Sequence, residues 1–115
     1  MSKEYSQLPQ VAFSILLALS LRERHGYEII KQVQEDSNNK IILGPGALYT
    51  SIKQLRTRGL IVEVSHADDV RRRYYKLSDA GRDILASELE YYENAVLLAK
   101  NRKLLHGNYS YGTGV

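Results

Sequence analysis

Hydrophobic residues follow a helical spacing in the first part of the chain. From residue 8 to residue 21 they are so dense that we predict a helix buried on most of its circumference, with Pro9 in its first turn. A second helix is predicted to start at Gly26 and to end at the polar residues 37–39. The apolar run at 41–43 is long enough for no more than a short strand.

A third helix is predicted from Pro45 to about Arg58, because Gly59 follows in a position that commonly ends a helix. Its apolar residues are spaced by four and three and therefore share one face, formed by Leu48, Ile52 and Leu55. The opposite face is small and polar and carries no acidic residue; it consists of Gly46, Thr50, Lys53, Gln54 and Thr57.

Two stretches of alternating residues, 60–66 and 72–78, follow the third helix. They are separated by the turn-forming sequence ADDVR at 67–71, which predicts a β-hairpin. Ser78 then stands where it can cap the start of a long helix.

The long helix after Ser78 has two neighbouring lines of apolar residues. One has the alternating spacing of a helix-packing seam and consists of Leu85, Leu89, Tyr92, Val96 and Ala99. The other lies beside it and consists of Ile84, Tyr91, Ala95 and Leu98. Together they cover roughly half of the circumference, so we predict a partner helix from a second copy of the chain. Residues 106–115 lack apolar periodicity, and we predict a mobile tail there.

The composition is that of a single soluble domain with a local excess of positive charge. Of the 115 residues 43% are hydrophobic and 25% charged, and the net charge is +3. Between Lys53 and Lys76 there are seven Lys or Arg and three acidic residues, a local charge of +4 that is compatible with a polyanionic partner. The longest apolar run, at 11–19, is too short to cross a bilayer, so we expect a cytoplasmic protein with no membrane partner.

The sequence LGPGALYTSIKQL at 43–55 places two glycines and a proline ahead of the third helix. A phosphate can bind at such a place, because the first amides of a helix are unpaired. A nucleotide-binding P-loop is excluded, since no Lys followed by Ser or Thr comes after the second glycine. One interpretation is that the glycines serve backbone geometry alone. It is compatible with the other, in which this helix approaches nucleic acid through Gly46, Ala47, Tyr49, Thr50, Lys53 and Gln54.

Within this set, Gln54 has the chemistry to read adenine, and Lys53 that to read guanine or to bind phosphate. Tyr49 lies at the edge of the apolar face. Its ring is as well explained by packing beneath the hairpin as by contact with a nucleic-acid backbone.

Arginines at three consecutive positions, Arg71–Arg73, follow the hairpin turn, where they can neutralise phosphates. They stand at the end of the hairpin turn, where alternation sends neighbours to opposite faces, so we expect that not all three face one groove. A solvated charge run is the alternative, with Asp68 or Asp69 pairing with one arginine. Of Tyr74 and Tyr75, we expect one to pack inward against the third helix and the other to point outward.

The sequence contains no recognisable catalytic or metal-binding constellation. It has no cysteine, and its three histidines share no ligand spacing. His25 is better explained as a structural residue, and the adjacent Asp68 and Asp69 by the preference of aspartate for turns. We therefore expect neither an enzyme nor a cofactor.

The predicted order of three helices, a hairpin and a long helix is typical of a winged helix-turn-helix with an added C-terminal helix, mostly α with a small β-hairpin. The chain also resembles the PadR family of bacterial transcriptional regulators over residues 8–104. The resemblance rests on HGYEI at 25–29, LGPGALYTSIKQL at 43–55, GLI at 59–61 and RRRYYKLSDAGRDIL at 71–85.

The resemblance implies a homodimeric repressor that binds a palindromic operator in double-stranded DNA. The recognition helix at 45–58 would enter the major groove, and the wing at 61–77 would lie on the backbone with Arg71, Arg72 and Arg73. The DNA-binding domain is predicted at 1–78 and the dimerisation helix at 79–105.

Tyr91 and Tyr92 are the one feature that points to a small ligand, since aromatic side chains at a dimer seam can hold a planar molecule. The resemblance implies a small aromatic effector near this seam, whose residues are Phe13, Leu17, Leu85, Leu89, Tyr91, Tyr92 and Val96. The alternative is that Tyr91 and Tyr92 only pack in the core of the seam and bind no ligand. Two other functional classes stay open: a protein-binding winged helix, against which the basic middle of the chain argues, and a sensor whose main signal is the effector.

Overall fold

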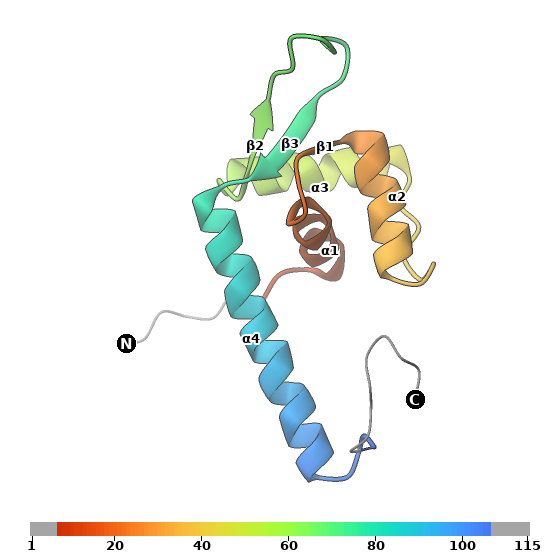
Figure 1. Ribbon diagram of the computed structural model, residues 1–115, viewed down its shortest axis with the longest axis vertical. Coiled ribbons are helices and arrows are strands. Elements are labelled where there is room, and N and C mark those ends of the chain that lie inside the picture. Colours follow the sequence, from red (N-terminus) through yellow and green to blue (C-terminus); the bar gives the residue numbers. More distant parts are fainter. Residues whose placement is uncertain (1–6, 107–115) are drawn as a thin grey trace. The chain divides into compact units, whose positions relative to one another are not determined.

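The computed structural model describes residues 7–106, and Figure 1 labels its helices and strands. The helices are α1 (Gln10–Leu19), α2 (Gly26–Asp36), α3 (Pro45–Thr57) and α4 (Asp79–Asn101). The strands are β1 (Arg24–His25), β2 (Ile61–Val64) and β3 (Tyr74–Leu77). The chain divides into two compact units between Leu85 and Ala86, so that the first unit contains α1 to α3, the sheet and the start of α4.

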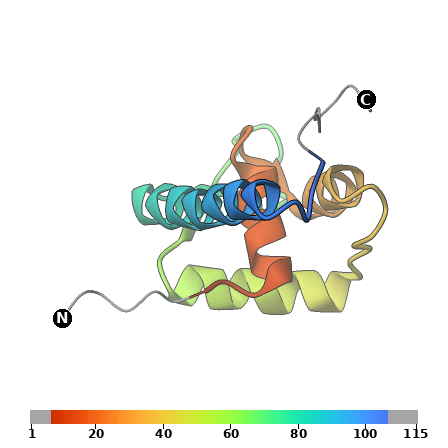
Figure 2. The ribbon, with the colours of Figure 1, turned by 90° about the horizontal axis from the view of Figure 1, so that it is seen from below.

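The core of the first unit lies between α1, α2 and α3, and Figure 2 shows α3 along one side of this unit with α1 across it. As the dense apolar pattern predicts, α1 buries most of its circumference. The side chains that α2 and α3 bury are Ile29, Val33, Leu48, Ile52 and Leu55. The polar face of α3 is therefore turned away from the core.

Helix α1 is shorter than the predicted range of 8–21, because the chain turns after Leu19 and enters β1. Pro9 is its N-terminal cap residue, one position before the first helical residue. At the other end, the buried Arg24 donates a hydrogen bond from Nε to the carbonyl oxygen of Ala18, at 3.0 Å. This bond satisfies a carbonyl that the end of a helix would otherwise leave unpaired.

The sheet has three antiparallel strands in the order β1-β3-β2. The predicted hairpin is confirmed as β2 and β3, in which Ile61 pairs with Leu77 and Val64 with Tyr74. The hairpin prediction does not include β1, because two residues are too few to show alternation. The strands are also shorter than predicted, and they leave a longer connection at 65–73, which we call the wing loop.

Residues 41–43, a run too short to predict more than a possible strand, form no strand. Leu43 is buried in the core, so this segment is apolar because it anchors an irregular connection and not because it pairs with a strand. Before it, Asn38 and Asn39 have φ values of 55° and 66°, a left-handed conformation that asparagine tolerates better than most residues. The chain reverses there between α2 and α3.

The C-terminus of α3 ends in a glycine turn, as predicted. Gly59 has a φ of +75°, and its amide donates to the carbonyl of Arg56 while the amide of Leu60 donates to that of Leu55. These two bonds form a Schellman motif, which requires the left-handed residue.

The start of α4 is bonded to this turn. Ser78 caps the helix, as predicted, since its Oγ accepts from the amide of Gly81 at 3.0 Å. The same hydroxyl donates to the carbonyl of Gly59 at 2.6 Å, and the Ser78 amide donates to the carbonyl of Leu60 at 3.1 Å. Gly81 approaches that carbonyl so closely that a Cβ would collide with it.

Helix α4 has 23 residues and continues into the second unit. Its large exposed apolar side chains are Leu89, Tyr91, Tyr92, Leu97 and Leu98. Of the predicted tail at 106–115, only His106 lies within the described residues. Within residues 7–106, no helix has the length and apolar character needed to cross a bilayer.

Candidate nucleic-acid interface

The polar face of α3 is exposed, as its sequence predicts. Thr50, Lys53 and Gln54 line one shallow surface hollow together with Thr57 and Arg58. Hydroxyl, amide and cationic groups therefore lie within about two and a half turns at the C-terminal part of α3, with no carboxylate among them. Such a surface can donate hydrogen bonds and neutralise anionic oxygen atoms.

The N-terminus of α3 is open to solvent. Gly44 is the cap residue but has no side chain with which to bond the first amides, and Pro45 occupies the first turn. Gly46 and Ala47 are exposed, and a Cβ at Gly46 would meet no atom within 4 Å. The fold itself therefore does not require a glycine at position 46.

Tyr49 links α3 to the start of α2. Its ring is 47% exposed, and its hydroxyl lies against Gly26, where a Cβ would collide with it. Tyr49 also lines a hollow together with Tyr75 of β3. The structure thus places one part of the ring in a packing contact and leaves the rest at the surface, so both interpretations of this residue keep their support.

The wing loop contains all three arginines, and each is exposed. Arg71, Arg72 and Arg73 line one groove of about 760 Å³, whose lining also includes Lys31 of α2 and Tyr49 of α3. The same three arginines also line a second hollow together with Glu63 and His66, so the expectation that not all three face one groove stays a prediction. The strand β3 begins only at Tyr74, so the three arginines lie outside it.

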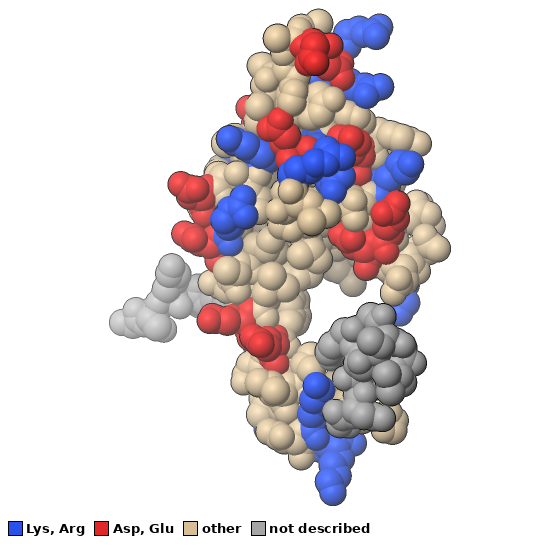
Figure 3. Space-filling model, viewed as in Figure 1, with Lys and Arg blue, Asp and Glu red and all other residues tan. Residues whose placement is uncertain are grey.

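Ion pairs occupy several of the cations around this groove. Arg56 Nη1 lies 3.1 Å from Glu63 Oε1, and Arg73 Nη1 lies 3.8 Å from the same oxygen. Arg72 Nε lies 3.7 Å from Asp69 Oδ2, the type of local pair that the sequence allows. On the face shown in Figure 3, Lys and Arg side chains lie among Asp and Glu rather than in one continuous basic patch.

His25 is structural, as expected, but its role was not visible in the sequence. Its Nδ1 accepts from the amide of Glu28 at 3.4 Å, while Glu28 Oε1 accepts from the amide of His25 at 3.1 Å, which makes a capping box at the start of α2. Burial raises the pKa of the Glu28 carboxyl, but hydrogen bonds from Arg22 and from the His25 amide outweigh it and leave the pKa below its ordinary value.

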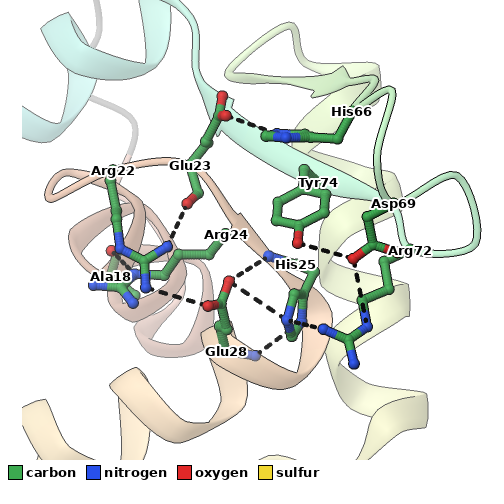
Figure 4. A network of polar contacts seen from close by, with 10 residues as sticks. All are labelled: Ala18, Arg22, Glu23, Arg24, His25, Glu28, His66, Asp69, Arg72 and Tyr74. Atoms are coloured by element: carbon green, nitrogen blue, oxygen red, sulfur yellow. Dashed lines mark hydrogen bonds and ion pairs between the residues drawn. The ribbon is translucent and has the colours of Figure 1, made fainter.

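The two tyrosines of β3 point to opposite sides, as predicted. Tyr75 is buried in the core, and Tyr74 is half-buried on the other side of the strand. The hydroxyl of Tyr74 donates to Asp69 Oδ2 at 3.1 Å. Tyr74, Asp69 and His25 belong to a polar network at the base of the wing loop that the sequence did not single out (Figure 4).

The predicted seam residues lie in different environments. Phe13 and Leu17 of α1 are half-buried, and Leu85 is buried in the core of the first unit. On α4, Leu89 is exposed and Val96 half-buried. Tyr91 and Tyr92 are exposed, and their rings are in contact edge to face with centroids 5.6 Å apart. Within residues 7–106, no group of three side chains is placed to bind a metal ion.

The family model for the transcriptional regulator PadR-like family matches residues 15–87. The chain belongs to the PadR-like family of transcriptional regulators. This agrees with the expectation that the protein is not an enzyme, because the family consists of regulators. No curated protein sequence gives a significant match to this PadR-like chain.

Solved structures confirm the predicted winged helix-turn-helix fold of this PadR-like protein. A PadR family transcription regulator from Clostridium difficile R20291 is 25% identical, with a TM-score of 0.71 over 84% of this chain and 100% of that one. A transcriptional regulator from Clostridium thermocellum is 24% identical, with a TM-score of 0.66 over 84% of this chain and 92% of that one. Bacillus subtilis PadR, solved in complex with operator DNA, is 23% identical, with a TM-score of 0.62 over 70% of this chain and 47% of that one.

Proposed function

We propose that this PadR-like protein binds double-stranded DNA sequence-specifically, with α3 in the major groove and the wing, residues 61–77, on the sugar-phosphate backbone. The observation that carries the proposal is the exposed face of Thr50, Lys53 and Gln54 on α3, together with the hollow that Lys53 lines with Arg73 of the wing loop. An exposed polar helix reads base edges, and arginines outside it neutralise phosphate. Bacillus subtilis PadR, of the same fold, was solved with operator DNA.

The side chains of α3 suit particular base edges. An amide such as that of Gln54 pairs with the N6 and N7 atoms of adenine, and the ammonium of Lys53 suits the acceptors of guanine. Thr50 has a hydroxyl that both donates and accepts, so it is compatible with several bases. We assign base recognition to these three residues and backbone contact to Gly46, Ala47 and Tyr49 at the open N-terminus of the helix.

We further propose that two copies pair through α4 and bind a palindromic operator. Leu89 and Tyr92 are large, exposed and one turn apart on the same helix, with the half-buried Val96 one turn further. Contiguous apolar surface of this kind marks an interface, and a two-fold dimer presents two recognition helices to two equivalent half-sites.

Repression and its release by an effector belong to the same proposal. A bound dimer that covers a promoter would block transcription, which a reporter gene behind the selected site would measure. Tyr91 and Tyr92 support an aromatic effector, because they present two rings in edge-to-face contact at the surface of α4. Calorimetric titration with simple phenols, compared between the native protein and a Tyr91→Ala, Tyr92→Ala variant, tests this part.

Selection from a random double-stranded DNA library tests DNA binding itself. We expect the native protein to enrich a palindrome, and Lys53→Ala to relax the preference at one position of each half-site by about 10- to 100-fold. Arg102→Ala is the matched control, because it removes the same charge from a residue that follows α4, and it should leave the preference unchanged. If no motif is enriched, the protein-binding winged helix becomes the better explanation.

Gly46→Ala tests whether the start of α3 approaches a phosphate. Since a Cβ at this position meets open space, the substitution should not destabilise the protein. If the backbone of Gly46 lies against a phosphate, the added methyl group should lower affinity for the selected DNA by roughly tenfold, because a charge-assisted hydrogen bond is lengthened. Fluorescence anisotropy measures the affinity. An unchanged affinity would show that Gly46 merely starts the helix.

A further inference from the structure

Four side chains, which we call the wing clamp, join the wing loop to the start of α2: His25, Asp69, Arg72 and Tyr74 (Figure 4). Arg72 Nη1 lies 3.1 Å from His25 Nε2, and Arg72 Nε lies 3.7 Å from Asp69 Oδ2. The same carboxylate oxygen accepts the hydroxyl of Tyr74 at 3.1 Å. The guanidinium of Arg72 therefore connects both ends of this network.

The ring of Tyr74 is held from two sides. The His25 ring contacts it edge to face, with centroids 5.2 Å apart and the planes at 81°. The His66 ring makes the other contact, with its centroid 4.0 Å from that of Tyr74 and the planes at 37°. His66 Nε2 in turn lies 2.7 Å from Glu23 Oε2, one residue before β1. The wing loop thus contacts Glu23 and His25, the two residues that flank Arg24, through two separate side chains.

The capping box sets the position of the His25 ring in the clamp. The backbone amide of His25 donates to Glu28 Oε1, and the ring lies over the first turn of α2. A neutral imidazole accepts at only one nitrogen at a time, so the ring accepts from either the Glu28 amide or Arg72. The contact with Arg72 needs the tautomer in which Nε2 accepts and Nδ1 carries the proton, because a guanidinium only donates. The start of α2 then keeps the bond from the His25 amide to Glu28 Oε1.

The three arginines differ in their surroundings. Within residues 7–106, Arg71 has no hydrogen bond or ion pair. Arg73 has only the 3.8 Å contact with Glu63, whose oxygen is closer to Arg56 at 3.1 Å. An exposed ion pair at this distance contributes little to stability, so Arg73 can readily exchange it for a contact with a DNA phosphate. Only Arg72 would lose contacts to two side chains, His25 and Asp69, if it turned to a phosphate.

We propose that Arg72 is a positioning residue: it closes the wing clamp and fixes the wing loop relative to α2, while Arg71 and Arg73 neutralise DNA phosphates. This inference rests on the proposed DNA binding. It divides the arginine triplet into two roles that the sequence RRR does not distinguish. The clamp acts on DNA affinity by holding Arg71 and Arg73 beside the groove that Lys31 and Tyr49 complete.

The salt dependence of DNA affinity separates the two roles, since only phosphate contacts release counterions. A dimer with about six such contacts should show a slope of log affinity against log salt near −5. Arg71→Ala and Arg73→Ala should each make this slope shallower by about 2, because each removes one contact per subunit. Arg72→Ala should lower affinity by about tenfold at every salt concentration and leave the slope unchanged.

Two further variants test the clamp without a change in phosphate charge. His25→Asn keeps an efficient N-cap for α2 but is too short to reach Arg72, so it should lower affinity about as much as Arg72→Ala. The double variant His25→Asn, Arg72→Ala should lose no more DNA affinity than either single variant, because the two residues act through one contact. Arg71→Lys should bind DNA as tightly as the native protein. Arg72→Lys should bind as weakly as Arg72→Ala, since an ammonium lacks the fork that bridges His25 and Asp69.

A slope that becomes as shallow in Arg72→Ala as in Arg71→Ala would overturn the positioning role and leave DNA binding intact. Additive losses from His25→Asn and Arg72→Ala would overturn it as well. If the native protein itself retains no DNA at low salt, the proposed function fails instead, so the two failures are distinguishable. Circular dichroism and thermal unfolding of each variant exclude an effect through loss of the fold.

Discussion

Replacing Gly81 with alanine should lower the free energy of unfolding by about 2–3 kcal/mol, equivalent to roughly 10–20 °C in melting temperature. The reason is the approach of α4 to the turn after α3, where a Cβ on Gly81 would collide with the carbonyl group of Leu60. The obstacle is backbone held by a hydrogen bond from the Ser78 amide, so it cannot move aside as a side chain can. Urea unfolding at one fixed protein concentration measures the effect.

Gly46→Ala is the matched control for this prediction. Both glycines lie in the first turn of a helix with no left-handed φ, but a Cβ at Gly46 meets open space. Alanine there should raise stability by about 0.4–1 kcal/mol, because it reduces the entropy of the unfolded chain. Equal effects of the two substitutions would show that helix α4 does not depend on close contact with Leu60.

The arrangement of helices could be predicted from the sequence because it depends on local spacing. The apolar residues of α3 at intervals of four and three define its buried face, and Gly59 marks its end. The strand β1 could not be predicted in this way. It consists of two residues, and it is a strand only because Tyr74 and Tyr75 pair with it from a distant part of the chain.

The candidate site was predictable only in part, for a similar reason. Thr50, Lys53 and Gln54 share an exposed face because helical geometry places them there. The surroundings of the arginines depend on where β3 begins, and the predicted strand started two residues before the observed one, at Tyr74. The different role of Arg72 depends on His25, and no periodicity connects residues that are 47 positions apart.

Tyr49 and Gly26 illustrate how two sequence motifs become one structural feature. Gly26 lies in HGYEI and Tyr49 in LGPGALYTSIKQL, and each motif is readable alone as a helix start. In the structure the hydroxyl of Tyr49 occupies the space that a side chain at position 26 would need. The glycine therefore sets how closely the first turn of α2 approaches α3, a requirement that is invisible until both helices are in place.

Replacing Leu89 with glutamate should convert the proposed dimer into monomers. Leu89 is 42% exposed although it belongs to an apolar line with Tyr92 and Val96, and pairing of two α4 helices would remove it from water. A carboxylate in that position would have to be buried without a partner, which costs several kcal/mol per subunit. Sedimentation equilibrium measures the oligomeric state directly.

Loss of the dimer should also lower the affinity for the palindrome. Two linked recognition helices bind about 100-fold or more tightly than one, because the second helix acts at a high effective concentration. A single half-site should be bound equally well by the native protein and by Leu89→Glu, since α3 and the wing belong to the first unit. Ile42→Glu, which changes a more exposed apolar residue between α2 and α3, should leave the dimer intact. A Leu89→Glu protein that stays dimeric would place the subunit interface elsewhere than on this face of α4.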